Sequence, residues 1–281
     1  MSATQTTLKQ GSYALGHTPQ EYERLRAQAR GWETATGRLL DQVGLRQGTS
    51  CLDAGCGPGE TMRMLAERVG PAGRVLGVDA DLSLGTMALG MLHDAGHRQC
   101  GFHPADLTGD EPIPGAPFDL VYARLLLFHL PQRVAVLGRL WNAVAPGGCL
   151  VIQDYDLRGV SVLPSLFSVE EAGRVITATF EAAGADVHVG ARLAQLFAEA
   201  GVGTPDGTDV AGRIEPLATG RVFVESAFRS LLPAALAHGI ITHDAADALL
   251  SVLDHDAARF AGSPLVWPLL IGAWKRKEER A

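Results

Sequence analysis

CLDAGCGPGE, residues 51–60, decides the fold class, because it joins an apolar run to three glycines spaced two residues apart. An apolar strand that runs into Gly55, Gly57 and Gly59 and then into a helix is typical of an α/β protein with a ligand at its first strand end. Glycine permits positive φ and lets the main chain approach a ligand where a side chain would collide. We therefore expect a cofactor site at this loop.

The residues around the loop distinguish between classes of cofactor. A dinucleotide fingerprint reads G-x-G-x-x-G, whereas the sixth place here is Glu60, which disfavours an NAD-linked oxidoreductase. Asp53 lies just before the loop, where a carboxylate would repel a pyrophosphate and attract an ammonium or sulfonium group. We therefore predict a cationic ligand.

Apolar runs alternate with segments of helical period over the first half of the chain, which predicts a parallel sheet covered by helices. We expect strands at 50–55, 74–80, 100–106, 118–124 and 149–156, helices at 61–70, 83–96 and 133–146, and one or two helices within 19–44. Further on, the pattern predicts helices at 168–184, 190–201, 221–239 and 242–262, a strand at 209–217 and a strand-like run at 263–277.

This pattern divides the chain into four parts. The helical stretch between the last two predicted strands is too long for a simple connection, which indicates a lid or cap. We expect an N-terminal helical segment over the cofactor site at 1–48, a cofactor-binding core at 49–219, a helical cap at 220–262, and a final strand and tail of the core at 263–281.

Composition restricts the partners. The chain has 281 residues, of which 47% are hydrophobic and 20% charged, and its net charge of −7 gives no general attraction to a phosphate backbone. We expect a small-molecule substrate, no nucleic acid and no membrane, with a homodimer as an option.

The four cysteines lack metal-site spacing, so no metal is expected. The N-terminus does not resemble a secretory signal, which favours the cytoplasm.

Two more acids follow predicted strands. Asp79 ends the second strand, 24 residues after Gly55, where an acid in nucleotide-binding α/β folds takes ribose hydroxyls. Asp106 ends the third strand, within reach of an adenine amino group. Because parallel strands bring their carboxyl ends to one edge, Asp53, Asp79 and Asp106 should converge on one crevice.

Several motifs within residues 50–156 together carry a resemblance to a known family: LDAGCGPG, VLGVDAD, PADL, FDLVYARLLLFHL and LWNAVAPGGCLVIQDYD. The segment resembles the class I S-adenosylmethionine-dependent methyltransferases of the small-molecule type, related to ubiquinone and menaquinone methyltransferases. The resemblance implies a Rossmann-like, seven-stranded, mostly parallel sheet with helices on both faces and an antiparallel last strand near 265–276. It also implies S-adenosyl-L-methionine as cofactor and S-adenosyl-L-homocysteine as product.

The resemblance also implies a set of cofactor-binding residues. Asp53 with the first two loop glycines would lie at the methionine part, Asp79 at the ribose, and Asp106 at the adenine. Arg124 would contact the methionine part through its backbone, and Tyr13 belongs to a segment that resembles an element closing over the cofactor. The full set is Tyr13, Asp53, Gly55, Gly57, Gly59, Asp79, Ala80, Ala105, Asp106, Leu107 and Arg124.

Catalysis of methyl transfer rests largely on positioning and exclusion of water, so a general base is optional. His129, which follows the fourth strand, is the best candidate for a base with a near-neutral pKa, and packing is the alternative role. Asp154, Tyr155 and Asp156 end the fifth strand and could bind or deprotonate substrate. An apolar chamber, or the core of the cap itself, would use Phe167, Phe180, Phe223, Phe228 and Trp267.

We interpret the chain as a methyltransferase acting on oxygen, nitrogen or carbon of a small, apolar or aromatic metabolite, in the manner of secondary metabolism. One alternative is a non-methylating enzyme that uses the bound sulfonium for other chemistry. Another is a non-catalytic binding protein or partner subunit. The intact glycine loop and the three strand-end acids favour an enzyme.

Overall fold

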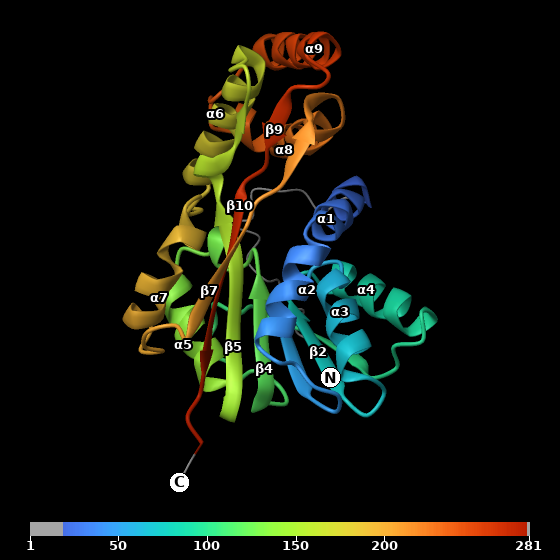
Figure 1. Ribbon diagram of the computed structural model, residues 1–281, viewed down its shortest axis with the longest axis vertical. Helices are drawn as coiled ribbons and strands as arrows, with labels where there is room; N and C mark the ends of the chain where they lie inside the picture. Colours follow the sequence, from blue (N-terminus) through green and yellow to red (C-terminus); the bar gives the residue numbers. More distant parts are fainter. Residues whose placement is uncertain (1–18, 280–281) are drawn as a thin grey trace, which may run out of the picture.

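A seven-stranded sheet forms the centre of the computed structural model, which describes residues 19–279 (Figure 1). The strand order is β3-β2-β1-β4-β5-β10-β7, and β10 is the one strand of this sheet that runs opposite to the other six. The strands are β1 (Ser50–Ala54), β2 (Arg74–Asp79), β3 (Cys100–Pro104), β4 (Phe118–Arg124), β5 (Val144–Asp156), β7 (Gly207–Ala211) and β10 (Leu269–Arg276). The expected Rossmann-like sheet with an antiparallel strand near the C-terminus is confirmed.

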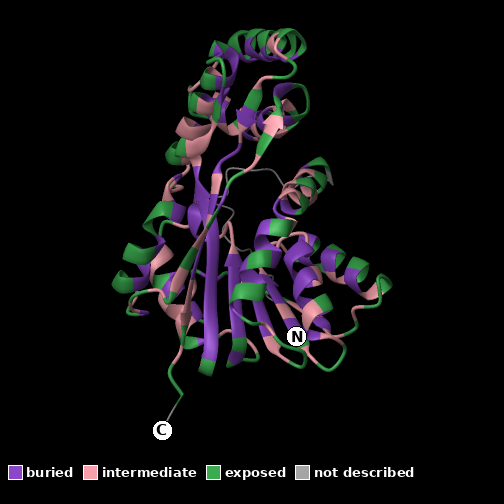
Figure 2. Ribbon diagram, in the orientation of Figure 1, coloured by how far each residue is buried: buried purple, intermediate pink, exposed green. Residues whose placement is uncertain are grey.

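Helices cover both faces of this sheet, so its central strands β4 and β5 are buried on both sides, with alternate residues pointing to opposite faces (Figure 2). Val121 and Ile152 point to the face that α5 and α7 cover, whereas Tyr122 and Val151 point to the face that α2 and α3 cover. The helices are α1 (Pro19–Gly31), α2 (Glu33–Gln42), α3 (Glu60–Val69), α4 (Leu82–Asp94), α5 (Arg133–Asn142) and α7 (Leu193–Glu199). Short 3₁₀ turns occur at η1 (Leu127–His129), η2 (Leu157–Gly159) and η3 (Val189–Arg192).

A second layer of structure stands over the carboxyl edge of the sheet and forms a cap (Figure 1). It consists of α6 (Phe167–Ala182), α8 (Leu217–Ala237) and α9 (His243–Arg259) with a small antiparallel sheet of β6 (Ser161–Val162), β9 (Pro264–Val266) and β8 (Ile214–Pro216). The cap has its own apolar core, in which Val169 of α6 packs with Phe228 of α8 and Leu253 of α9. Thus α6, which lies in the range expected for the core, packs with the cap.

Two predicted elements are divided in the structure. The run 263–277 gives β9 in the cap and β10 in the main sheet, because Pro268 between them has no N–H for a ladder hydrogen bond. The run 209–217 likewise gives β7 and β8 in two different sheets. The helix expected at 133–146 ends at Asn142, and Val144 already pairs with Phe118 in the main sheet.

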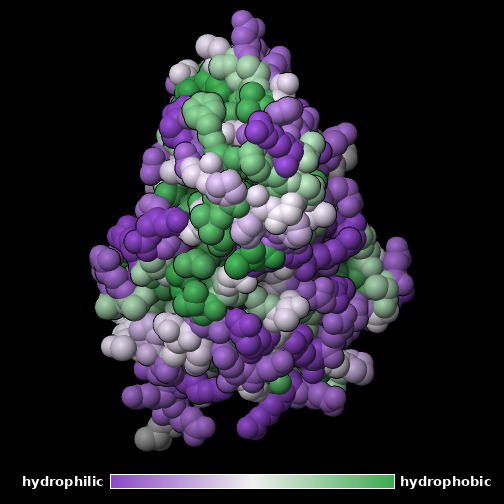
Figure 3. Space-filling model, turned by 45° about the horizontal axis from the view of Figure 1, so that its top comes forward, coloured by the Kyte–Doolittle hydropathy of each residue, from purple (hydrophilic) through white to green (hydrophobic). Residues whose placement is uncertain are grey.

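Figure 3 shows hydrophobic surface gathered on the upper part of one face of the molecule. The cap carries several large apolar side chains that are exposed, namely Leu163, Phe167, Ile214, Val222 and Val252. No helix among residues 19–279 is both long enough and apolar enough to cross a lipid bilayer.

Candidate cofactor and substrate site

A large cavity of about 1570 Å³ lies between the carboxyl edge of the sheet, α1 and the cap. Strand order reverses between β1 and β4, and an open α/β sheet leaves a crevice for ligands at such a point. Pockets for one small ligand measure roughly 300–1,000 Å³. The cavity therefore has room for a nucleotide-sized cofactor and a second molecule.

The structure brings most of the predicted cofactor residues to this cavity. Those that line it are Asp53, Gly55, Gly57, Asp79, Ala80, Ala105, Asp106, Leu107 and Arg124. Gly59 does not line it; a Cβ there would lie 3.0 Å from the Cβ of Ala88, so this glycine allows α3 and α4 to pack closely. Tyr13 lies outside the described residues.

The glycine loop adopts the conformation that its sequence predicts. Gly55 and Gly57 have φ values of 70° and 48°, in the left-handed region that favours glycine. The N–H of Gly57 donates to Oδ2 of Asp79 over 2.8 Å, and the N–H of Asp81 donates to Oδ1 of Asp79 over 2.9 Å. The second strand-end acid thus fixes the loop and faces the cavity at the same time.

Asp53 has an unusual position at the base of the cavity. Its side chain is buried, and its Oδ2 atom has no hydrogen-bond partner among the described residues. Burial raises the pKa of Asp53 to about 7, with a smaller upward contribution from Asp79, while the charge of Arg124 opposes the rise. A buried acceptor without a partner costs free energy, and a cationic ligand would satisfy it.

The fourth strand ends in a strained turn beside Asp53. Leu125 has φ of 54°, a left-handed conformation that residues other than glycine rarely adopt. The side chain of Arg124 lines the cavity, where its Nη1 donates to Oγ1 of Thr36 over 3.0 Å. Thr36 in turn donates to Gln153, which anchors the guanidinium from α2 and β5. The family resemblance implied a contact through the backbone of Arg124 only.

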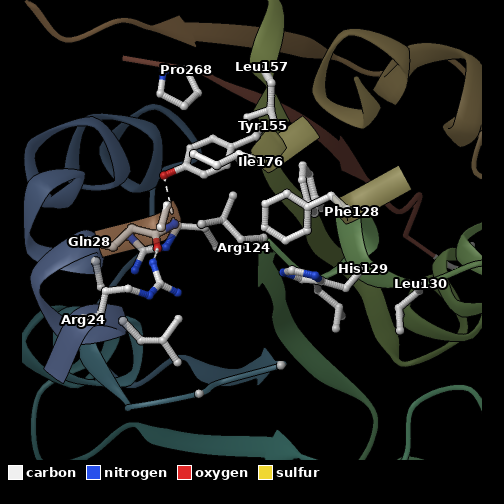
Figure 4. A pocket seen from close by; sticks show the side chains of 18 of the residues that line it. Arg24, Gln28, Arg124, Phe128, His129, Leu130, Tyr155, Leu157, Ile176 and Pro268 are labelled. Carbon is white, nitrogen blue, oxygen red and sulfur yellow. Dashed lines mark hydrogen bonds between the residues drawn. The ribbon is translucent and has the colours of Figure 1, made fainter. Parts of the chain in front are cut away.

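His129 lines the cavity from the η1 turn, against the rings of Phe128 and Phe180 (Figure 4). Burial and the positive charge of Arg24 lower the pKa of His129 to about 4. The imidazole is therefore neutral at pH 7 and a weak base, so the expected near-neutral pKa is wrong.

Asp154 does not line the cavity, contrary to the expectation that it meets the substrate. The carboxylate is fully buried, and its two oxygens accept hydrogen bonds from the backbone N–H groups of Phe128 and Tyr155, at 3.1 and 3.0 Å. Burial raises its pKa to about 7 against these hydrogen bonds. Asp154 therefore holds the η1 turn that carries His129.

Helix α1 supplies side chains that the sequence analysis did not identify as site residues. Arg24 and Gln28 project into the cavity from one face of the helix (Figure 4). Tyr22 reaches the N-terminus of α4, where its hydroxyl donates to Oδ2 of Asp81 over 3.0 Å. The i, i+4 spacing of Arg24 and Gln28 is visible in the sequence. Nothing in the sequence shows that this face is turned toward a cavity.

Apolar side chains line much of the upper part of the cavity, together with the charged residues Glu170, Arg174 and Glu181 of α6. Of the bulky cap residues considered above, Phe180 and Phe223 line it, whereas Phe228 is buried in the cap core and Phe167 is exposed. Trp267 is buried behind Phe223, with ring centroids 4.0 Å apart. Other apolar residues lining this part are Leu157, Val162, Leu163, Ile176, Val224 and Pro268.

Fold and site together define an α/β protein with a cofactor cleft and an adjoining capped chamber. Residues 51–148 match the family model described as a methyltransferase domain. A trans-aconitate 2-methyltransferase of Rhizobium leguminosarum is 36% identical over 136 residues, or 48% of each chain. Methyltransferase str3 of Strobilurus tenacellus is 32% identical over 189 residues, or 67% of this chain and 65% of the relative.

Solved structures show the same fold at low identity. A candidate methyltransferase from Bacillus halodurans superposes with a TM-score of 0.60 at 14% identity, and the match covers 87% of this chain and 99% of the other. A S-adenosylmethionine-dependent methyltransferase from Aquifex aeolicus superposes with a TM-score of 0.51 at 19% identity, covering 72% and 93%. The fold is therefore that of the class I S-adenosylmethionine-dependent methyltransferases, and residues 51–148 form a methyltransferase domain, as the motifs implied. It spans about half the length of the trans-aconitate relatives that it matches.

Proposed function

We propose that this protein transfers a methyl group from S-adenosylmethionine to a small molecule with an apolar body. The observation that carries the proposal is the partnerless Oδ2 of Asp53, buried at the base of a glycine loop in the cavity. A buried carboxylate fits the ammonium group of the methionine moiety. The residues present thus fit the cofactor that the family uses.

Each strand end contributes one contact in this proposal. Asp53 holds the ammonium group, Asp79 accepts from the ribose hydroxyls, and Asp106 lies at the adenine. Asp106 is oriented for this by its own turn, because its Oδ1 accepts from the N–H and the hydroxyl of Thr108 at 2.8 and 2.7 Å. When bound, S-adenosylmethionine supplies a methyl group activated by a sulfonium charge.

The apolar chamber supports an acceptor with an apolar body, held between α6 and α8. The residues that line it lie mostly beyond residue 148, outside the segment matched by the methyltransferase model. The relatives named for trans-aconitate are named for a carboxylate acceptor, so carboxylic acids belong in any screen beside phenols and amines. A role in secondary metabolism, a cytoplasmic location and a homodimer stay predictions.

The residues around the acceptor favour positioning over proton abstraction. His129 is a weak base in this environment, and Tyr155 has its pKa raised to about 12 by burial. Neither group readily takes a proton from an acceptor at pH 7. In this proposal the cap excludes water and the walls of the chamber orient the acceptor. Exclusion of water and positioning can together supply much of the rate of this class of reaction.

Calorimetric titration with S-adenosylmethionine, S-adenosylhomocysteine and NAD tests the cofactor. We expect the first two to bind and NAD to give no heat; a folded sample that binds neither sulfur compound would contradict the proposal. The purified protein is then incubated with S-adenosylmethionine carrying a labelled methyl group and a panel of acids, phenols and amines. A labelled product supports methyl transfer, whereas binding without transfer favours the alternative of a non-methylating protein.

A further inference from the structure

The loop of residues 105–117, between β3 and β4, carries the residues proposed at the adenine. Its first residues, from Ala105 to Thr108, line the cavity. The N–H of Ala105 donates to the carbonyl of Asp79 over 3.0 Å, and the other backbone hydrogen bonds of this loop are local. A segment without secondary structure holds one conformation only where contacts from other elements offset its conformational entropy. The contacts of this loop therefore decide how it faces a ligand.

The side chain of Arg139, on α5, supplies such contacts. Its Nη1 donates to the carbonyl of Leu107 over 2.5 Å, and its Nη2 donates to the carbonyl of Glu111. The planar guanidinium thus holds two carbonyls, four residues apart, in one fixed geometry. Arg139 forms no ion pair with a carboxylate within residues 19–279, so its hydrogen bonds serve this loop.

Helix α5 lies behind the loop and does not reach the ligand. None of its residues lines the cavity. The side chain of Leu107 is buried and belongs to the same apolar cluster as Leu137 and Leu140 of α5. Because α5 supports the loop from behind, Arg139 acts on a ligand only through the loop.

The carboxylate of Asp106 is the polar group that this loop presents to the cavity. Its Oδ1 accepts two hydrogen bonds from Thr108, whereas its Oδ2 accepts none within residues 19–279. Oδ2 is therefore the oxygen available to the amino group of adenine. The carbonyl of Leu107 that Arg139 holds is one residue away in the chain, so a shift of that carbonyl changes the direction of Oδ2.

We infer that Arg139 is a positioning residue for recognition of the adenine amino group. By holding the carbonyls of Leu107 and Glu111, its guanidinium keeps Asp106 in the orientation that accepts from this amino group. A carboxylate accepts from an amino group and repels a carbonyl oxygen, so the site distinguishes adenine from a purine with oxygen at that position. The inference deepens the proposed function and rests on it, because the cofactor has to bind in this cavity.

Calorimetric titration with S-adenosylhomocysteine and with S-inosylhomocysteine, whose purine has an oxygen in place of the amino group, measures this recognition. The wild-type protein should bind the adenosyl compound about tenfold or more tightly. Arg139→Met should reduce the preference to about threefold or less, mainly by weakening the binding of S-adenosylhomocysteine. Arg139→Lys keeps the charge without the planar fork, so its preference should lie between the two. If Arg139→Met does not fold, a loss of about twofold or more in Arg139→Lys supports the inference.

Two further variants separate positioning from a general loss of stability. Arg68→Met is the matched control, because Arg68 also donates to two carbonyls, those of Met64 and Gly37, each over 3.3 Å, and does not line the cavity. It should keep the wild-type preference. Asp106→Asn should abolish or reverse the preference, since an amide also donates. Adding Arg139→Met to Asp106→Asn should then change the ratio of the two affinities by less than about twofold.

The possible failures have different signatures. A preference of wild-type size in the folded Arg139 variants, or one that Arg68→Met lowers equally, would overturn the positioning role and leave the proposed function in place. Equal binding of the two compounds by the wild-type protein would overturn it as well, because no group would then recognise the amino group. If S-adenosylhomocysteine does not bind at all, the proposed function fails and the role of Arg139 fails with it.

Discussion

Asp53 and Asp154 show that the same residue type, equally buried at a strand end, serves two purposes. Both have a pKa raised to about 7 by burial. The difference lies in their partners, since the two oxygens of Asp154 accept backbone N–H groups whereas Oδ2 of Asp53 has no partner among residues 19–279. A satisfied carboxylate stabilises a turn, and an unsatisfied one beside a cavity is suited to a ligand.

Replacing Asp154 by alanine should destabilise the protein by about 2–3 kcal/mol, because it leaves the buried N–H groups of Phe128 and Tyr155 without acceptors. Urea unfolding followed by circular dichroism measures the change. Affinity for S-adenosylhomocysteine should stay within about threefold of the wild type, since Asp154 does not line the cavity. If the variant keeps its stability but loses methyl transfer, Asp154 has a catalytic role instead.

At the scale of elements, two glycines of α4 provide a matched test of helix packing. A Cβ at Gly85 would lie 2.1 Å from the ring of Phe102 on β3, whereas a Cβ at Gly90 would meet nothing within 4 Å. Gly85→Ala should therefore cost ~1–3 kcal/mol through overpacking. Gly90→Ala should stabilise by ~0.5–1 kcal/mol through helix propensity. Thermal unfolding compares the two, and equal effects would show that α4 can shift away from the sheet.

The sequence predicted the elements whose signals are local and missed those set by tertiary contacts. Alternating apolar runs and loop glycines report strands and turns directly, which is why β1, its loop and Asp79 were placed correctly. The orientation of Asp154 was not predictable, because being at a strand end does not decide whether a side chain faces a crevice or a neighbouring turn. Likewise, Arg24 belongs to a helix whose docking against the cap no local pattern encodes.

At the scale of the whole molecule, α1 joins the core to the cap across the cavity. Toward the cap, the hydroxyl of Ser230 on α8 donates to Glu21 over 2.5 Å. Toward the core, Arg26 pairs with Glu60 at the start of α3, with 3.2 Å between Nε and Oε1. One helix that carries Arg24 thus contacts both the core and the cap.

Buried titratable groups in and beside the cavity make the stability of the whole molecule depend on pH. A carboxyl group whose folded pKa is raised, as at Asp53 and Asp154, stabilises most at low pH, and this contribution is lost as pH rises from about 4 through 7. His129, whose folded pKa is lowered to about 4, acts in the opposite direction, since its contribution is complete above its ordinary pKa of 6.5 and is lost below it. Two carboxyl groups outweigh one imidazole, so these groups together should lower the free energy of unfolding between pH 5 and 7.

Saturating S-adenosylhomocysteine should oppose this loss, because its ammonium group favours the ionised form of Asp53. We expect ligand stabilisation, measured by urea unfolding at pH 5, 6 and 7, to grow by up to about 1.4 kcal/mol per pH unit. Asp53→Asn should weaken binding and remove this growth, because the amide does not titrate. Asp154→Asn is the control: it should change the pH dependence of the ligand-free protein and leave that of ligand stabilisation intact. If the stabilisation by ligand is equal at all three pH values in the wild-type protein, Asp53 does not bind the ammonium group, and its buried oxygen has a different partner.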